Sequence, residues 1–164
     1  MKIFYTDSFA IALTKDHRFP ISKYALLRKR IIDSNLFTPQ DFCVPRAATG
    51  AEITRVHDPE YLDSLAAASP VEGLVQLDPD TALGPHTLEA AFRASGAVVM
   101  AVDMVMGGEV ENAFCAIRPP GHHAEKASAM GFCFINNVAV GAAHALAAHG
   151  LSRVAVLDFD AHHG

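Results

Sequence analysis

Apolar and polar positions follow two different periods along the chain, one typical of helices and one typical of strands. Over 22–34, apolar residues recur at roughly helical spacing, which predicts a helix. A second helix is expected to begin after Asp58, a good N-cap residue, with Pro59 at its first position, and to end near Ala68. Two longer runs rich in alanine and valine, 86–108 and 134–150, predict largely buried helices that end at glycine.

Short β-prone runs lie between these helices, at 2–6, 113–117 and 153–157. The last of them contains four apolar residues in succession, which is typical of a parallel strand covered on both faces. The Gly-, Pro- and Asp-rich stretch 71–85 is expected to be a loop. Strands alternating with helices indicate an α/β fold. We find no internal repeat and no linker, so a single domain is expected over 1–164.

Composition narrows the class of protein. Of 164 residues, 51% are hydrophobic and 19% are charged, as in a globular domain. The net charge is −5 and no basic block is present, which argues against direct nucleic-acid binding. An acidic surface could attract a basic peptide or a polyamine. The chain shows no signal peptide or membrane span, so we expect a cytoplasmic protein that does not bind membranes.

The three cysteines, Cys43, Cys115 and Cys133, are far apart and form no Cys-x-x-Cys motif. This spacing argues against a disulfide framework and a structural zinc knuckle, and favours a reducing compartment. Histidine is the unusual residue. The chain has nine, and four of them form two adjacent pairs.

Both histidine pairs follow predicted strands. His122 and His123 come after the strand at 113–117, and His162 and His163 come after the strand at 153–157. In open parallel sheets, ligands bind beyond the carboxyl ends of the strands. The fold could therefore bring the two pairs together.

The motif Asp-x-Asp-x-His, formed by Asp158, Asp160 and His162, is the first candidate site. In an extended chain, alternating residues point to one side. Carboxylate and imidazole together suit a borderline divalent cation such as zinc, with two groups as ligands and the third orienting a neighbour. The alternative is a turn at a strand end with solvated acids.

The stretch "RPPGHH" is the second candidate. Pro119 and Pro120 restrict the backbone, and Gly121 permits a tight turn before the histidines. His122 and His123, held on a rigid loop, could act as general base and electrostatic partner. The alternative is a surface loop with two incidental histidines.

The remaining histidines carry less information. His57 is expected to end a strand and to be structural, and His144 and His149 are expected to pack or to face water on their helix. His17 and His86 are placed in loops, and no ligand set surrounds them in the sequence.

Two long motifs carry a family resemblance. "RPPGHHAEKASAMGFCFINNVAVGA" and "VAVLDFDAHHG" resemble the histone deacetylase superfamily, which shares its fold with the arginases. "HRFPISKY" and "VHDPEYLDSL" are similar to patterns in bacterial deacetylase-like proteins. The resemblance implies a three-layer α/β/α fold with a mainly parallel sheet, incomplete in this chain. It also implies zinc-dependent removal of an acetyl or other acyl group from lysine or a related amine.

The resemblance assigns roles to five residues. Asp160 and His162 match two zinc ligands, and Asp158 matches the acid that supports the first histidine and helps to hold a structural potassium ion. His123 matches the general base and acid, and His122 matches its electrostatic partner. Zinc lowers the pKa of water and polarises an amide carbonyl, which fits these assignments.

Further roles concern the substrate. Gly131 and Phe132 match the wall of the tunnel that admits the acyl-lysine chain, and Asp80 matches an acid at its rim. The family's third zinc ligand, an aspartate, and its oxyanion-stabilising residue, usually a tyrosine, lie further along than Gly164. Residues 1–164 are therefore expected to be the N-terminal portion of one domain and to have little or no activity alone.

Two other functions remain open at this point. One is an arginase-like C–N hydrolase with two manganese ions on the same fold. The other is a non-catalytic homologue that acts as a binding module. The substrate could be a protein, a polyamine or a small acylated metabolite, and a homo-oligomer is possible.

Overall fold

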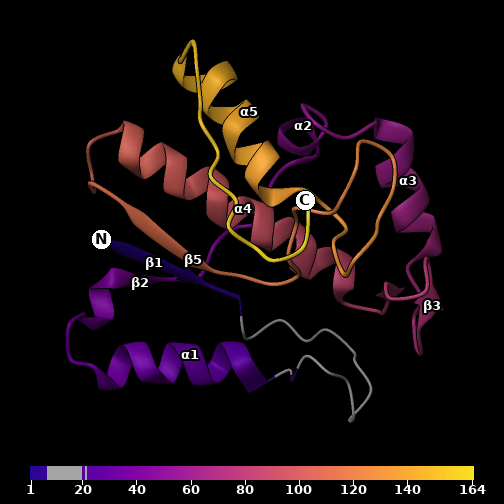
Figure 1. The fold of residues 1–164 in the computed structure, drawn as a ribbon, viewed down its shortest axis with the longest axis horizontal. Coiled ribbons are helices and arrows are strands. Elements are labelled where there is room, and N and C mark those ends of the chain that lie inside the picture. Colours follow the sequence, from indigo (N-terminus) through magenta and orange to yellow (C-terminus); the bar gives the residue numbers. More distant parts are fainter. Residues whose placement is uncertain (7–19, 21) are drawn as a thin grey trace.

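The structure is a computed structural model and describes residues 1–6, 20 and 22–164 (Figure 1). A parallel sheet lies at its centre. β1 (Lys2–Tyr5) is the middle strand, with β2 (Phe42–Cys43) on one side and β5 (Ala113–Ala116) on the other. Ile3 and Phe4 of β1 are fully buried. The predicted strands at the N-terminus and before the first histidine pair are therefore confirmed.

Helices cover both faces of this sheet. α1 (Ser22–Asp33) lies on one side of it, and α4 (Thr87–Met106) and α5 (Asn137–His149) lie on the other (Figure 1). This arrangement is the expected three-layer α/β/α fold. α4 and α5 approach each other closely, because Gly141 of α5 leaves room for the Val98 side chain, which a Cβ there would strike.

α5 is capped at both of its ends, whereas α3 (Pro59–Ala68) has an N-cap residue without a capping hydrogen bond. The side chain of Asn136 accepts a hydrogen bond from the backbone N–H of Ala139, at 3.0 Å, and so caps the start of α5. Gly150, in the left-handed conformation, ends the same helix as expected. α3 has Asp58 at its N-cap position and Pro59 at its start, as predicted, but the Asp58 carboxylate pairs with Lys126 and makes no capping hydrogen bond.

The smaller elements revise two sequence-based expectations. Residues 71–85 are not all loop, because β3 (Val75–Gln76) and β4 (Ala82–Leu83) form a short antiparallel pair. No strand ends at His57, since a short helix, α2 (Gly50–Ile53), and a turn precede it. A 3₁₀ helix, Pro39–Asp41, leads into β2. Of the stretch "HRFPISKY", residues His17, Arg18, Phe19 and Ile21 lie outside the described residues.

The predicted strand at 153–157 is wrong. These residues form no strand, and Val156 and Leu157 are 58% and 87% exposed. A parallel strand requires a hydrogen-bonded neighbour and cover on both faces. In the described part of the chain the sheet order is β2-β1-β5, so this run has no hydrogen-bonded strand beside it. Val154 instead lines an open apolar pocket of about 410 Å³ with residues of α4, α5 and β5.

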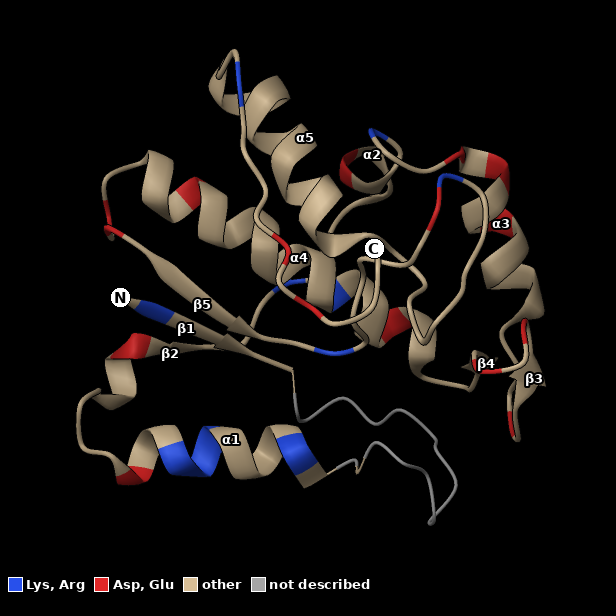
Figure 2. Cartoon of the chain, viewed as in Figure 1, with Lys and Arg blue, Asp and Glu red and all other residues tan. Residues whose placement is uncertain are grey.

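Charge is distributed unevenly over these elements. Lys and Arg concentrate on α1, whereas Asp and Glu are spread over the elements on the other side of the sheet (Figure 2). All three cysteines are free thiols, as expected. None of the described helices combines the length and the apolar character needed to cross a membrane.

Candidate active site

The two histidine motifs meet beyond the carboxyl end of β5. The His122 and His123 rings lie 4.1 Å apart between centroids, and the His123 and His162 rings lie 6.1 Å apart. The Nδ1 atom of His122 donates a hydrogen bond to Oδ2 of Asp158, at 2.9 Å. The structure therefore places four of the five predicted catalytic and metal-binding side chains in one cluster.

Asp160, the fifth, faces His162. Its Oδ1 atom accepts a hydrogen bond from the backbone N–H of His162, at 2.8 Å, and lies 3.0 Å from Nδ1 of the same residue. Asp158 makes the equivalent local contact, because its Oδ1 atom accepts from the backbone N–H of Asp160 at 3.0 Å. Each aspartate thus accepts a hydrogen bond from the backbone N–H two residues further on, which forms two successive turns. The Asp158 carboxylate is directed to His122, and the Asp160 carboxylate is directed to His162.

Both carboxylates are ionised at neutral pH. The backbone N–H of Asp160 and the His122 ring hold the pKa of Asp158 below its usual value. The backbone N–H and the ring of His162 lower the pKa of Asp160 in the same way. Hydrogen bonds to the charged form of a carboxyl group are the physical cause in both cases.

Gly131 and Phe132 form a tight turn against the histidine pair. Both have positive φ, 55° and 65°, and the backbones of Met130 and Cys133 on either side exchange two hydrogen bonds. Positive φ at both central residues is typical of a type I′ turn. A Cβ on Gly131 would collide with the His123 ring, so only glycine permits this close approach.

Thr81 ties this turn to the loop that contains Asp80. The Thr81 hydroxyl accepts a hydrogen bond from the backbone N–H of Phe132, at 2.9 Å, and donates one to Asp78 at 3.0 Å. Phe132 thus stays in a conformation that is rare for a bulky residue. Asp80 is exposed in the same loop, and its carboxylate forms no hydrogen bond with the other predicted site residues.

Sequence reasoning missed Thr81. The stretch "DPDT" is a turn signal that could have indicated a local Asp78–Thr81 contact. Nothing in the sequence indicated the longer-range bond to Phe132.

Buried polar residues hold the histidine loop in place. His57 donates from Nδ1 to the Lys126 carbonyl, at 3.3 Å, and its Nε2 atom accepts from the backbone N–H of Asn136, at 2.9 Å. Burial lowers the pKa of His57, which keeps the ring neutral and Nε2 an acceptor. The expected structural role of His57 is therefore confirmed. Asn137 supports the same loop by donating to the Pro119 carbonyl at 3.2 Å.

The donor groups around Asp160 and His162 suit a divalent metal. An ionised carboxylate and an imidazole nitrogen lie 3.0 Å apart, and both side chains are open to solvent. This pair of donors fits zinc as two of its usual ligands. Burial raises the pKa of the nearby Cys133 to about 11, so its thiol stays protonated and is a poor ligand.

Comparison with known proteins decides the family. A family model described as the histone deacetylase domain matches residues 17–164, which include both histidine motifs. The chain belongs to the histone deacetylase family. This membership favours the deacetylase interpretation over the arginase-like one.

Two curated members of the histone deacetylase family illustrate the match. The chain is 44% identical over 117 residues to the histone deacetylase-like amidohydrolase of Pseudomonas aeruginosa, covering 71% of this chain and 30% of that protein. It is 43% identical over 125 residues to human polyamine deacetylase HDAC10, covering 73% of this chain and 18% of that protein. The chain therefore spans less than a third of either relative.

A solved structure of similar sequence has the same fold. The HD domain of HDA15 superposes with a TM-score of 0.80 at 27% identity, covering 90% of this chain and 43% of that one. Agreement over so much of the chain confirms the α/β fold with its parallel sheet.

Proposed function

We propose that this chain supplies part of the active site of a zinc-dependent deacylase, which removes acetyl or other acyl groups from lysine or a related amine. The observation that carries the proposal is the clustering of His122, His123 and His162 around the Asp158–His122 hydrogen bond. Family membership and the names of the curated relatives support an amide-cleaving enzyme.

His123 is the general base and acid in this proposal. It takes a proton from the attacking water and returns it to the leaving amine, which one imidazole can do within a turnover. His122, oriented by Asp158, balances the charge that develops nearby. The hydrogen bond that Asp158 accepts from His122 has no carboxylate counterpart at His123 among the described residues.

Asp160 and His162 are the zinc ligands that this chain provides. Zinc, when bound, polarises the amide carbonyl and makes water a stronger acid. Asp158 remains directed at His122, where it can also offer an oxygen to a structural potassium ion. The remaining zinc ligand and the oxyanion-stabilising residue are expected outside residues 1–164, which would then be the N-terminal portion of the domain.

The turn at Gly131 and Phe132 forms a wall beside the catalytic histidine. Because Gly131 lies directly against the His123 ring, an extended amine chain passing this wall would bring its acyl group to that ring. Asp80 would meet positive charge or backbone N–H groups of a substrate at the rim, which its exposure on the loop anchored by Thr81 supports. Acetylated lysine peptides, acetylated polyamines and small acylated amines all fit this description.

A substrate panel tests the proposal. The full-length protein that contains this chain is incubated with an acetyl-lysine peptide, an acetylated polyamine and a small acylated amine, and the released acyl acid is measured. We expect turnover of at least one amide, its loss on metal chelation, and its loss in the His123→Ala variant. A folded, zinc-loaded protein that cleaves none of the three but binds them would indicate the binding module instead.

A further inference from the structure

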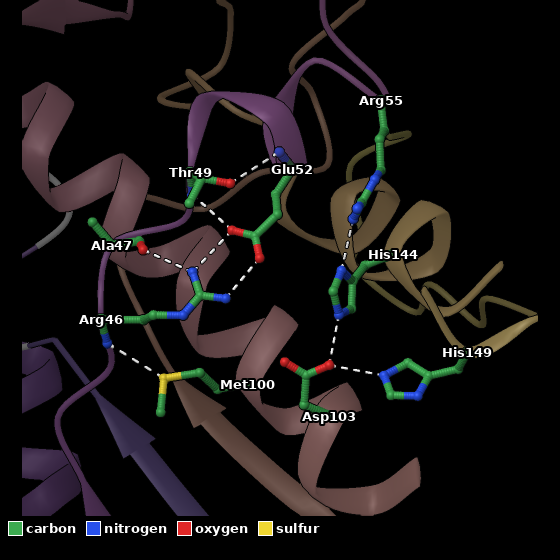
Figure 3. Close-up of polar contacts among 9 residues, drawn as sticks. All are labelled: Arg46, Ala47, Thr49, Glu52, Arg55, Met100, Asp103, His144 and His149. Carbon is green, nitrogen blue, oxygen red and sulfur yellow. Dashed lines mark hydrogen bonds and ion pairs between the residues drawn. The ribbon is translucent and has the colours of Figure 1, made fainter. Parts of the chain in front are cut away.

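A second cluster of metal-binding side chains lies on the helix pair, away from the histidine motifs. Asp103 comes from α4, and His144 and His149 come from α5 (Figure 3). The Nε2 atoms of His144 and His149 lie 2.6 and 2.8 Å from the same oxygen, Oδ1 of Asp103. One ligand atom from each residue falls within a group whose members are all within 4.8 Å of one another.

The burial of these residues suits an ion that enters from solvent. The side chain of His144 is 7% exposed, that of His149 is 24% exposed and that of Asp103 is 43% exposed. His149 is the last residue of α5, directly before Gly150, so its ring can shift without disturbing a following turn. His144 is therefore a buried ligand with a fixed position, and His149 is a partly exposed ligand whose position can adjust.

Arg55 sets which ring nitrogen of His144 carries the proton. Its Nη1 atom lies 2.7 Å from Nδ1 of His144 (Figure 3). A guanidinium group only donates hydrogen bonds, so Nδ1 of His144 is the acceptor and Nε2 carries the proton given to Asp103. A metal ion at Nε2 would need the opposite tautomer, in which Nδ1–H would point at Arg55. Because Arg55 is exposed, it can move away when an ion binds.

We propose that Asp103, His144 and His149 form a second site for a borderline divalent cation, such as zinc, cobalt(II) or nickel(II), and that Arg55 keeps its affinity low. Two imidazoles and a carboxylate are a ligand set that these cations accept, with one position left for water. The ligand atoms now sit at hydrogen-bond distances and would spread to about 3.3 Å, the separation expected around a tetrahedral ion.

An ion at this site would join α4 to α5. The same α5 begins at Asn137, which holds the loop of the predicted catalytic histidines through the Pro119 carbonyl. We therefore expect bound metal to raise the thermal stability of the protein. This effect does not depend on the proposed deacylase activity, because none of the three ligands belongs to the histidine motifs.

Cobalt(II) binding tests the site directly. The full-length protein is prepared with Asp160→Ala and His162→Ala, which remove the proposed catalytic ligands, and this background is titrated with cobalt(II). Visible absorption and equilibrium dialysis report binding, and the midpoint of thermal unfolding is measured with and without the ion. We expect this background to bind one equivalent of cobalt(II) and to unfold at a higher temperature when the ion is bound. Adding His149→Ala should abolish both effects. Magnesium should have no effect, because it prefers oxygen ligands.

The Arg55→Gln variant tests whether Arg55 keeps the metal affinity of the cluster low. Removing a group that contacts a ligand changes metal affinity by about 10- to 100-fold, and here the change should be a gain of about tenfold. A gain in affinity cannot arise from misfolding. The metal site is overturned if cobalt(II) binds equally with His149→Ala or if no equivalent binds, and the cluster is then a hydrogen-bonded link between helices. The role of Arg55 is overturned if Arg55→Gln leaves the affinity unchanged.

Discussion

His122 and Asp158 are 36 positions apart in the chain, yet Nδ1 of the ring donates to Oδ2 of the carboxylate across 2.9 Å. This hydrogen bond joins the loop after β5 to the Asp-x-Asp-x-His motif. The ionised carboxylate orients the His122 ring and leaves His123 as the histidine without an acid of its own in the described part of the chain. Within the described residues the two adjacent histidines are therefore not equivalent.

His123→Ala should reduce activity of the complete enzyme more than His122→Ala, while both variants retain zinc. Losing a general base costs about 10²- to 10⁴-fold, and losing a group that only stabilises charge costs less where other donors remain. The measurement is kcat/KM as a function of pH for each variant beside the parent protein. The assignment is reversed if His122→Ala removes the pH dependence and His123→Ala only scales the curve.

Asp160→Ala should abolish stoichiometric zinc, whereas Asp158→Asn should keep most of the zinc and lower the turnover number. The two carboxylates contact different side chains, because Asp160 faces the proposed zinc ligand His162 and Asp158 faces His122. Metal analysis of the two purified variants, with the parent as control, measures the difference. Equal loss of zinc in both would contradict this division of roles.

Gly131→Ala should impair activity because the added methyl group strikes the His123 ring. Gly73→Ala is the matched control, since Gly73 also has positive φ, 76°, but has open space around its Cβ position. Backbone strain should cost each variant about 1 kcal/mol of unfolding free energy, and Gly131→Ala should lose more because of its clash with His123. Only Gly131→Ala should also lower kcat/KM, by tenfold or more. Equal kcat/KM values for the two variants would mean that the turn does not position His123.

The protein should lose stability in acid through Glu52. A hydrogen bond from Arg46, together with that from Thr49, lowers the pKa of Glu52 from 4.5 to about 2 (Figure 3). A carboxyl group whose pKa is lower in the folded state stabilises the fold above its unfolded pKa. That contribution, about 2 kcal/mol, is lost as pH falls from about 4.5 to about 2.

The Glu52→Gln variant tests whether this part of the stability is lost between about pH 4.5 and about pH 2. The variant should be less stable than the parent at pH 7 and should differ from it much less near pH 2. Urea unfolding at several pH values gives the free energies. Glu89→Gln is the control, because Glu89 forms an exposed pair with Arg93 and should change stability by less than about 1 kcal/mol. A constant difference between Glu52→Gln and the parent across the pH range would disprove the linkage.

The 164-residue chain by itself should show little or no deacylase activity, because the remaining zinc ligand and the oxyanion donor are proposed to lie elsewhere. The assay uses the substrates of the panel above and the full-length protein as the positive control. Robust, chelator-sensitive turnover by the short chain would show that another group completes the site.

The sequence by itself determined most of the helices, because the signals that start and stop them are local. The helix expected over 22–34 is observed at Ser22–Asp33, and the one expected over 86–108 at Thr87–Met106. Glycine stops, capping residues and apolar spacing act within one or two turns and are visible in the chain. The two histidine motifs were also visible, since each is a short run of uncommon residues.

Only the tertiary structure decided which of these features meet. The run at 153–157 has the composition of a buried strand, but strand formation depends on neighbours that its own residues cannot specify. The bond from Thr81 to Phe132 and the cluster of Asp103, His144 and His149 depend on how distant elements pack. Packing of one helix against another sets which side chains face each other, and that register leaves no local pattern in a single sequence.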